Sequence, residues 1–144
     1  MTFRKIKNIF FVGIGGMGMS GIAELLYKLD FNIVGSDITS NENVNRLEKL
    51  GIKVYIGHDP KHLKGIDALV YSSAIPMENP EIIKARQKMI PVIRRAEMLA
   101  ELISLKKTSI GVGGTHGKTT TSSMVWAILD HAKKDPTLVV GGLV

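Results

Sequence analysis

The sequence contains no cysteine, so disulfide bonds and thiolate metal sites are excluded. It also lacks any apolar run near the roughly 20 residues that a membrane-spanning helix requires. After the basic start Met1–Lys7, the apolar run Ile9–Val12 is interrupted by glycines and is too short for the core of a secretion signal. We therefore expect a cytoplasmic protein without membrane insertion, and the missing cysteine is consistent with a reducing compartment.

Aromatic residues are scarce, at 6% of the chain, and the basic residues are scattered rather than gathered in a stripe. Nucleic-acid sites usually combine a basic groove with interleaved aromatic side chains, so we expect no nucleic-acid partner. The formal net charge of +6 instead suits small anionic ligands such as phosphorylated compounds. The doublet Arg94-Arg95 could approach such an anion or could simply be solvated.

The composition is that of a folded globular chain, with 44% hydrophobic and 22% charged residues and only 5 prolines. Short apolar runs alternate with segments of helical periodicity, which is typical of an α/β fold with a parallel sheet. Strands are expected at Ile9–Val12, Phe31–Gly35, Val54–Ile56, Ala68–Tyr71 and Pro91–Ile93. Helices are expected from Met19 to Leu29, from the cap Ser40-Asn41 to Leu50, from Asn79-Pro80 to about Lys88, and from Arg94 to Leu105.

A second unit is expected after the charged pair Lys106-Lys107. The pattern there predicts a strand at Ser109–Val112, a glycine-rich loop, a helix from Thr119 to Lys133 and a strand at Leu138–Val140. Residues 108–144 are too few to enclose a core of their own, and the last apolar strand would have an unpaired edge. We therefore expect the natural protein to continue beyond this segment.

The first glycine-rich loop contains Gly13, Gly15 and Gly18, follows an apolar strand and opens a helix. In dinucleotide-binding folds such a turn lets the backbone approach a pyrophosphate at the helix N-terminus. Asp37 lies 19 residues after Gly18, where these folds place the carboxylate that accepts ribose hydroxyls. The pattern leaves open NAD or another nucleotide with a pyrophosphate. It also leaves open a simple exposed turn for Asp37.

The second glycine-rich loop contains Gly117, Lys118 and Thr119 between a predicted strand and a predicted helix. Such a loop offers backbone N–H groups to a triphosphate, a lysine to its β and γ phosphates and a hydroxyl to magnesium. It departs from the general pattern, because Val112 stands where the first glycine is usual. His116 could touch phosphate or could merely fill the turn. The other histidines show no metal-ligand spacing, so no zinc site is expected.

Several short sequence motifs, in the same order along the chain, resemble those of the Mur ligase family of peptidoglycan synthesis. Among the members of this family, they are most similar to those that add L-alanine. The resemblance covers nearly the whole chain and accounts for Val112, because these ligases begin their ATP loop at the position of Gly114. The matching words are Phe11–Glu24, Gly35–Asp37, Tyr55–His58, Ser72–Ile75, Ile90–Ile93 with Arg95–Glu101, Gly114–Thr120 and Gly141–Val144.

The resemblance implies a Rossmann-like parallel-sheet domain over residues 1–107 that binds a UDP-sugar, followed by the truncated start of a P-loop ATPase domain over residues 108–144. It implies that the first glycine loop holds the UDP pyrophosphate, with the other residues nearer the uridine. The implied UDP-sugar residues are Gly13, Gly15, Gly16, Met17, Gly18, Met19, Ser20, Ser36, Asp37, His58, Ser72, Ser73 and Ala74.

The family reaction, as the resemblance implies it, joins L-alanine to UDP-N-acetylmuramate through an acyl phosphate made with ATP and Mg²⁺. Lys118 would be the catalytic residue, offsetting charge on the β and γ oxygens, and Thr119 would hold the metal. The implied ATP-binding residues are Gly114, Thr115, His116, Gly117, Lys118, Thr119 and Thr120. Similar ligases are much longer than this chain, so we expect the 144 residues to bind the UDP-sugar more readily than they catalyse.

Three alternatives remain at this point. A related ligase that recycles muropeptides shares the Gly114–Thr120 loop, although the words around Met19 and Ser72–Ile75 favour the alanine-adding enzyme. An NAD-binding dehydrogenase domain would explain the first loop but not the second. A nucleotide-sensing module without catalysis would carry both.

Overall fold

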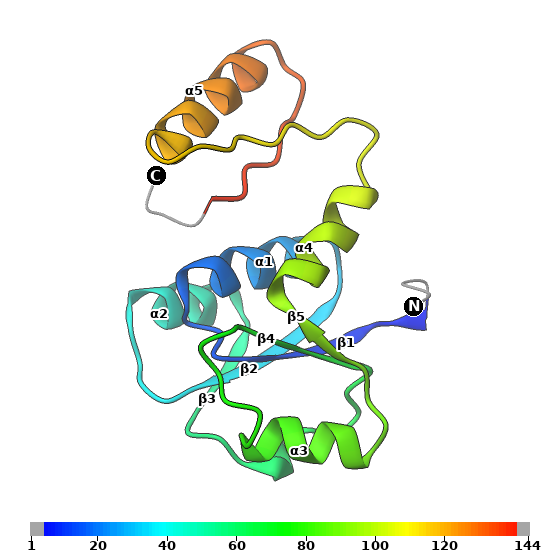
Figure 1. Cartoon of the computed structure of the whole chain (residues 1–144). Helices are drawn as coiled ribbons and strands as arrows, with labels where there is room; N and C mark the ends of the chain where they lie inside the picture. The colour runs from blue at the N-terminus through cyan, green and yellow to red at the C-terminus, as the bar shows by residue number, and fades with distance from the viewer. Residues whose placement is uncertain (1–4, 141–144) are drawn as a thin grey trace.

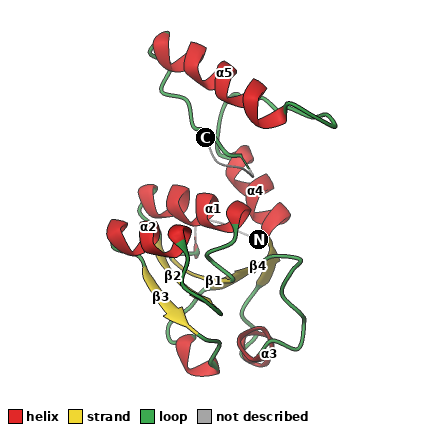
Figure 2. Cartoon of the chain, turned by 90° about the vertical axis from the view of Figure 1, so that its left-hand side faces the viewer, coloured by secondary structure: helices red, strands yellow, loops and turns green. Residues whose placement is uncertain are grey.

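The computed structural model describes residues 5–140 as a parallel α/β fold with helices on both faces of one sheet (Figure 1). The matching word Gly141–Val144 lies outside the described residues. The five strands lie in the order β3-β2-β1-β4-β5, and every neighbouring pair is parallel. The predicted α/β fold with a Rossmann-like parallel sheet is confirmed. Helices α1, α2 and α4 cover one face and α3 covers the other, as Figure 2 shows from the side.

The elements of the sheet domain fall close to their predicted ranges. The strands are β1 (Asn8–Val12), β2 (Asn32–Asp37), β3 (Lys53–Ile56), β4 (Ala68–Tyr71) and β5 (Val92–Arg94). The helices are α1 (Met17–Lys28), α2 (Glu42–Leu50), the short 3-10 helix η2 (Pro60–His62), α3 (Pro80–Gln87) and α4 (Arg95–Ser104). None of the helices within residues 5–140 is both long enough and apolar enough to cross a bilayer.

The core has two halves because the central strand β1 is buried on both faces. Ile9 and Phe11 pack with α1, α2 and α4, whereas Phe10 and Val12 pack with α3. All four side chains are fully buried. This is why β1 is a continuous apolar run rather than an alternating one.

Two helix caps predicted from the sequence are confirmed. The side chain of Asn41 accepts a hydrogen bond from Val44 N at 2.9 Å, and Gly51 ends α2 in the left-handed conformation at φ 102°. Asn79 caps α3 in the same way, accepting from Glu81 N, and Pro80 occupies the first turn. These caps satisfy helix-end groups that would otherwise lack partners.

The expectation for the second unit is partly wrong. The helix is present as α5 (Lys118–His131), but neither Ser109–Val112 nor Leu138–Val140 forms a strand. A strand needs a neighbour to satisfy its N–H and C=O groups, and the two segments do not pair with each other or with the sheet. No residue of α5 is buried, which agrees with the view that this segment cannot enclose a core.

The start of the sheet is held by Asp67, which lies immediately before β4. Its Oδ2 accepts from the main-chain N–H of Lys7 at 2.9 Å and of Asn8 at 2.8 Å, and from the Asn8 side chain at 3.2 Å. These hydrogen bonds, first that from the Asn8 main chain, lower the pKa of Asp67 below its ordinary value of 3.8.

We expect Asp67→Asn to destabilise the chain at neutral pH and to lose that effect in acid. A lowered pKa stabilises the fold fully above the unfolded-state value of about 3.8, and this stabilisation disappears as the pH falls through the folded-state value. The measurement is the free energy of unfolding in urea at several pH values. Asp135→Asn, which removes an exposed carboxylate from the C-terminal segment, is the control. A difference from wild type that does not change with pH would contradict the assignment.

Candidate functional site

The candidate site lies at the carboxyl edge of the sheet, defined as the edge at which all five parallel strands end. The chain runs from β1 outward to β2 and β3 on one side and then returns to β4 and β5 on the other. The connections that follow β1 and β4 therefore lead away in opposite directions along the sheet, and open α/β sheets bind ligands in the crevice at this point.

The first glycine loop is anchored to the end of β2. The main-chain N–H groups of Gly13 and Ile14 both donate to the carbonyl oxygen of Ser36, at 2.8 and 3.0 Å. Gly13 adopts φ 77°, a conformation that favours glycine, and the N–H of Gly16 donates back to Gly13 O at 3.1 Å. The turn thus has a defined shape before any ligand binds.

The peptide of Gly15 is held from both sides by polar side chains. Its N–H donates to Asp37 Oδ2 at 2.8 Å, and its carbonyl oxygen accepts from the side-chain amides of Asn41 and Asn43 at 3.2 and 3.0 Å. The other oxygen of Asp37 accepts from Ile38 N. Asp37 is therefore not a free turn residue, because it joins the end of β2 to the glycine loop. The sequence pattern indicated Asn41 only as a helix cap, and it did not indicate Asn43.

The N-terminus of α1 offers unpaired N–H groups to the crevice. Gly16 is the N-cap and gives no side-chain hydrogen bond. Within residues 5–140, the N–H groups of Met17 and Gly18 have no hydrogen-bond partner. The guanidinium of Arg95 lies beside them, with Nη1 only 3.0 Å from the position that a Cβ on Gly18 would occupy. Unpaired N–H groups, the helix dipole and a guanidinium together form an anion-binding arrangement.

Two of the expected ligand residues in α1 face the protein instead. Met19 is buried in the core, and Ser20 is buried as well. The Ser20 hydroxyl donates to Met17 O at 3.3 Å and accepts from Arg46 Nη2 at the same distance. These side chains thus fix the helix, whereas the exposed side chain of Met17 lies at the surface.

The loop after β4 lies on the other side of this point, and its Ile75 side chain reaches the glycine loop. Ile75 Cδ1 is 3.0 Å from the position of a Cβ on Gly13, and the N–H of Ile75 closes a turn on Ser72 O at 3.0 Å. Ser73 and Ala74 are exposed at the tip of this turn.

An open cavity of about 420 Å³ lies between this loop and the start of α4. Arg94 lines it and donates from Nε to the Tyr71 hydroxyl at 3.4 Å, and this contact raises the pKa of Arg94 above its ordinary value. The cavity therefore carries positive charge over apolar walls. It is lined by Tyr71, Ser73, Ile75, Pro76, Met77, Arg94, Arg95 and Ala96.

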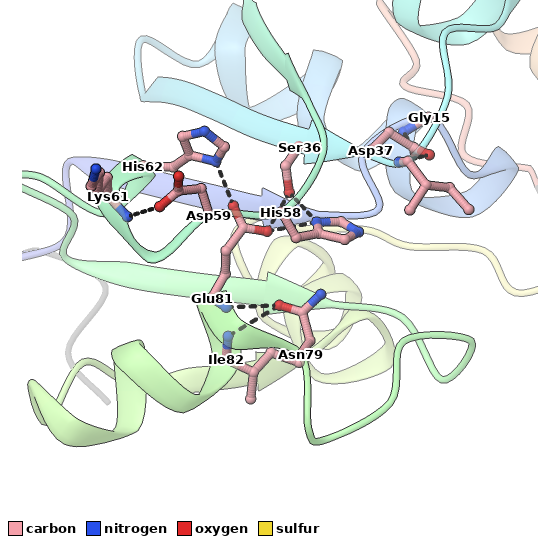
Figure 3. Close-up of polar contacts among 11 residues, drawn as sticks. Gly15, Ser36, Asp37, His58, Asp59, Lys61, His62, Asn79, Glu81 and Ile82 are labelled. Atoms are coloured by element: carbon pink, nitrogen blue, oxygen red, sulfur yellow. Dashed lines mark hydrogen bonds and ion pairs between the residues drawn. The ribbon is translucent and has the colours of Figure 1, made fainter.

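Ser36 and His58 belong to a buried polar cluster that also contains Glu81 and His62 (Figure 3). The Glu81 carboxylate is fully buried and accepts from the Ser36 hydroxyl at 2.6 Å. His58 Nδ1 lies 2.7 Å and His62 Nδ1 2.8 Å from its two oxygens. The hydroxyl of Ser36 is therefore used inside the protein. Residues 5–140 contain no group of three or more metal-ligating side chains arranged to hold an ion.

The second glycine loop lies apart from the sheet in both overall views (Figure 1, Figure 2). Gly114 and Gly117 adopt positive φ angles of 148° and 79°, and the Lys118 ammonium donates back to Gly114 O at 2.5 Å. Thr115, His116 and Thr120 are exposed. Lys118 and Thr119 line one hollow of about 280 Å³, together with Val112, Ser122, Val139 and Val140.

Comparison with known proteins gives a consistent result. A model of the Mur ligase family, catalytic domain, matches residues 8–107. A UDP-N-acetylmuramate–L-alanine ligase of Caulobacter sp. (strain K31) is 53% identical over 97% of this chain, and that of Paramagnetospirillum magneticum is 55% identical over the same share. The chain spans 29% of the length of each of these relatives.

Solved structures agree in fold. The UDP-N-acetylmuramate–alanine ligase of Thermotoga maritima superposes with a TM-score of 0.90 and 36% identity, over 96% of this chain and 32% of that one. The UDP-N-acetylmuramate:L-alanyl-γ-D-glutamyl-meso-diaminopimelate ligase of Neisseria meningitides gives a TM-score of 0.86 and 32% identity, over 96% of this chain and 44% of that one.

Two glycine substitutions should have opposite effects on stability. A Cβ on Gly15 would lie 2.8 to 2.9 Å from Val44 Cγ2, Asn41 Nδ2 and Asp37 Oδ2, so Gly15→Ala should destabilise the chain by about 1 to 3 kcal/mol. Gly21 lies within α1 with nothing within 4 Å of such a Cβ, so Gly21→Ala should stabilise it by about 0.5 to 1 kcal/mol. Urea unfolding measures both. If Gly15→Ala and Gly21→Ala changed the free energy of unfolding equally, the contacts around Gly15 would not be as close as the structure shows.

Proposed function

This chain belongs to the Mur ligase family, and we propose that it carries the UDP-sugar site and the ATP loop of a UDP-N-acetylmuramate:L-alanine ligase. The observation that carries the proposal is the anion-binding arrangement at α1, formed by Met17 N, Gly18 N and Arg95. It lies in the crevice that the strand order creates. The alanine-adding relatives at 53% and 55% identity support the choice of substrate.

In the proposed complex the UDP pyrophosphate lies over the N-terminus of α1. Met17 N and Gly18 N would donate to it, and Arg95 would pair with its charge. Asp37 can still accept a ribose hydroxyl, because each of its oxygens has a second lone pair beyond the one used by Gly15 N or Ile38 N. Ser73 and Ala74, exposed across the crevice, would contact the diphosphate or the sugar.

The hollow beside the second glycine loop fits a triphosphate with its magnesium. Lys118 and Thr119 line it together, and the loop that precedes them turns at Gly114 and Gly117, both with positive φ. ATP bound there would supply the phosphoryl group that activates the lactyl carboxylate for attack by the alanine amine. Lys118 would have to leave Gly114 O and turn to the phosphates, where it offsets negative charge. Thr119 would hold the metal.

We also propose a division at residue 107, with a UDP-sugar domain over 1–107 and the start of the ATP-binding domain over 108–144. The described part of the first range has a core on both faces of its sheet, whereas α5 in the second range buries no residue. A muropeptide-recycling ligase is the second candidate, supported by the fold similarity to the Neisseria enzyme at lower identity.

The first test is calorimetry of the 144-residue chain with UDP-N-acetylmuramate, ATP with Mg²⁺, and NAD in parallel. We expect UDP-N-acetylmuramate to bind and NAD not to bind. Arg95→Ala should weaken UDP-N-acetylmuramate binding about tenfold, which corresponds to about 1.4 kcal/mol, since a charge-assisted contact is lost. Lys88→Ala, which removes an exposed charge at the far end of α3, should leave the affinity unchanged. Tight NADH binding without competition from the UDP-sugar would refute the ligase assignment. Binding of the tripeptide L-alanyl-γ-D-glutamyl-meso-diaminopimelate in place of L-alanine would favour the recycling enzyme, because both ligases take UDP-N-acetylmuramate.

A second expectation concerns turnover by the isolated chain. Because the chain spans 29% of its relatives, and because α5 and the sheet lie apart (Figure 1), we expect no alanine-dependent release of phosphate from ATP. The measurement is phosphate release with UDP-N-acetylmuramate and ATP, with and without L-alanine. Release that depends on alanine would show that these residues hold a complete active site.

A further inference from the structure

The most unusual group in the described part of the chain is the Glu81 carboxylate. It is fully buried, and its hydrogen-bond partners are one hydroxyl and two imidazoles, with no lysine or arginine among them. Glu81 lies in the first turn of α3, where an acidic residue is ordinary. Its side chain, however, extends from the helix to Ser36 at the end of β2 and to His58 and His62 after β3 (Figure 3).

The hydrogen bonds around Glu81 determine where the two histidines carry their protons. In the ionised form Glu81 can only accept hydrogen bonds, and the Nδ1 atoms of His58 and His62 then each carry a hydrogen. In a neutral imidazole one nitrogen donates and the other accepts. An ionised Glu81 beside a neutral His58 therefore makes Nε2 of His58 a hydrogen-bond acceptor.

The Nε2 atom of His58 is available to a ligand. Within residues 5–140 it has no hydrogen-bond partner, and no buried side-chain nitrogen or oxygen there lacks one, so Nε2 reaches the surface. The side chain is 14% exposed. In Figure 3 this nitrogen points away from Glu81, toward the side of the view on which Asp37 and Gly15 lie. His62 differs, because its ring stacks on Tyr55 at 3.8 Å between centroids.

The position of His58 along the carboxyl edge of the sheet is where the nucleobase of a bound nucleotide would lie. The strands β1, β2 and β3 are consecutive neighbours, and they end in the glycine loop, in Asp37 and in Gly57-His58. Gly57 N donates to Asp37 O at 2.7 Å, so His58 directly follows a residue bonded to the ribose-binding candidate. If the glycine loop holds the pyrophosphate and Asp37 the ribose, the base lies next, at His58.

We propose that Glu81 is a positioning residue that selects uracil over cytosine by fixing the proton of His58 on Nδ1. Uracil presents an N3–H donor between two carbonyl oxygens, whereas cytosine presents an unprotonated N3. An acceptor at Nε2 of His58 can accept a hydrogen bond from N3–H of uracil, whereas it would face the lone pair on N3 of cytosine. A site built to hydrogen-bond one partner discriminates strongly against the analogue that lacks the group. The inference rests on the proposed function, since it assumes a UDP-containing ligand.

The test joins a spectroscopic measurement on the free 144-residue chain with nucleotide titrations. ¹⁵N NMR of the imidazoles should show neutral His58 with its hydrogen on Nδ1. UDP should bind at least about tenfold more tightly than CDP. Glu81→Gln can donate from its amide to Nδ1, so His58 should change to the Nε2–H form and the preference for UDP should fall about tenfold. A purely structural role for Glu81 would weaken UDP and CDP equally.

Two further variants keep the test decisive if Glu81→Gln does not fold. His58→Ala leaves the buried carboxylate in place and should abolish the UDP preference. His62→Gln keeps a donor for Glu81 but removes the other imidazole, and it should retain both the Nδ1–H form of His58 and the preference.

Three results would overturn the inference while leaving the proposed function intact: a hydrogen on Nε2 of His58 in the wild type, equal binding of UDP and CDP, or an unchanged preference in His58→Ala. Absence of any UDP or UDP-sugar binding by the wild type would overturn both.

Discussion

The placement of β1 between β2 and β4 is the constraint on which every other feature of the site depends. The parallel register aligns Val12 with Ser36 on one side and with Tyr71 on the other, so three distant segments leave the sheet at the same level. The register of the strands alone therefore brings the glycine loop, Asp37 and the turn at Ser72 to the same edge of the sheet. The constraint is maintained by four apolar side chains, Ile9–Val12, which face both halves of the core. A polar side chain at any of these four positions would be buried, because both faces of β1 are covered, and its burial would destabilise the fold.

The parts of the fold that could be predicted from the sequence are those with a local cause. An apolar run buried on both faces, an asparagine that caps the next helix and a glycine in the left-handed conformation each act within a few residues, as at Asn41 and Gly51. The glycine loop could be predicted for the same reason. The place of Asp37 at the end of the next strand could also be anticipated, because dinucleotide-binding folds fix its spacing from the loop, although the hydrogen bond between Asp37 and Gly15 N could not.

The remaining features depend on residues that are far apart in the chain. Glu81 reaches Ser36 across 45 residues and His58 across 23, and neither spacing has a recognisable pattern. Asn43 and Arg95 contribute to the glycine loop only because α2 and α4 pack beside α1. The errors at Ser109–Val112 and Leu138–Val140 have the opposite origin. Their composition suits a strand, but strand formation depends on a partner, which composition does not reveal.

The two glycine loops differ in how many other elements contact them, and this difference indicates which of them would move in the proposed ligase. The loop at Gly13 is hydrogen-bonded to β2 and α2 and packs against the turn after β4, so its shape is a property of the whole sheet domain. The loop at Gly114 is stabilised mainly by its own Lys118 and by the start of α5. A phosphoryl transfer requires the reacting atoms to approach within about 3 to 3.5 Å. Distortion of the sheet edge would break the contacts that hold the loop at Gly13. Movement of the ATP loop toward the UDP-sugar would break fewer contacts, so we expect the ATP loop to be the part that moves.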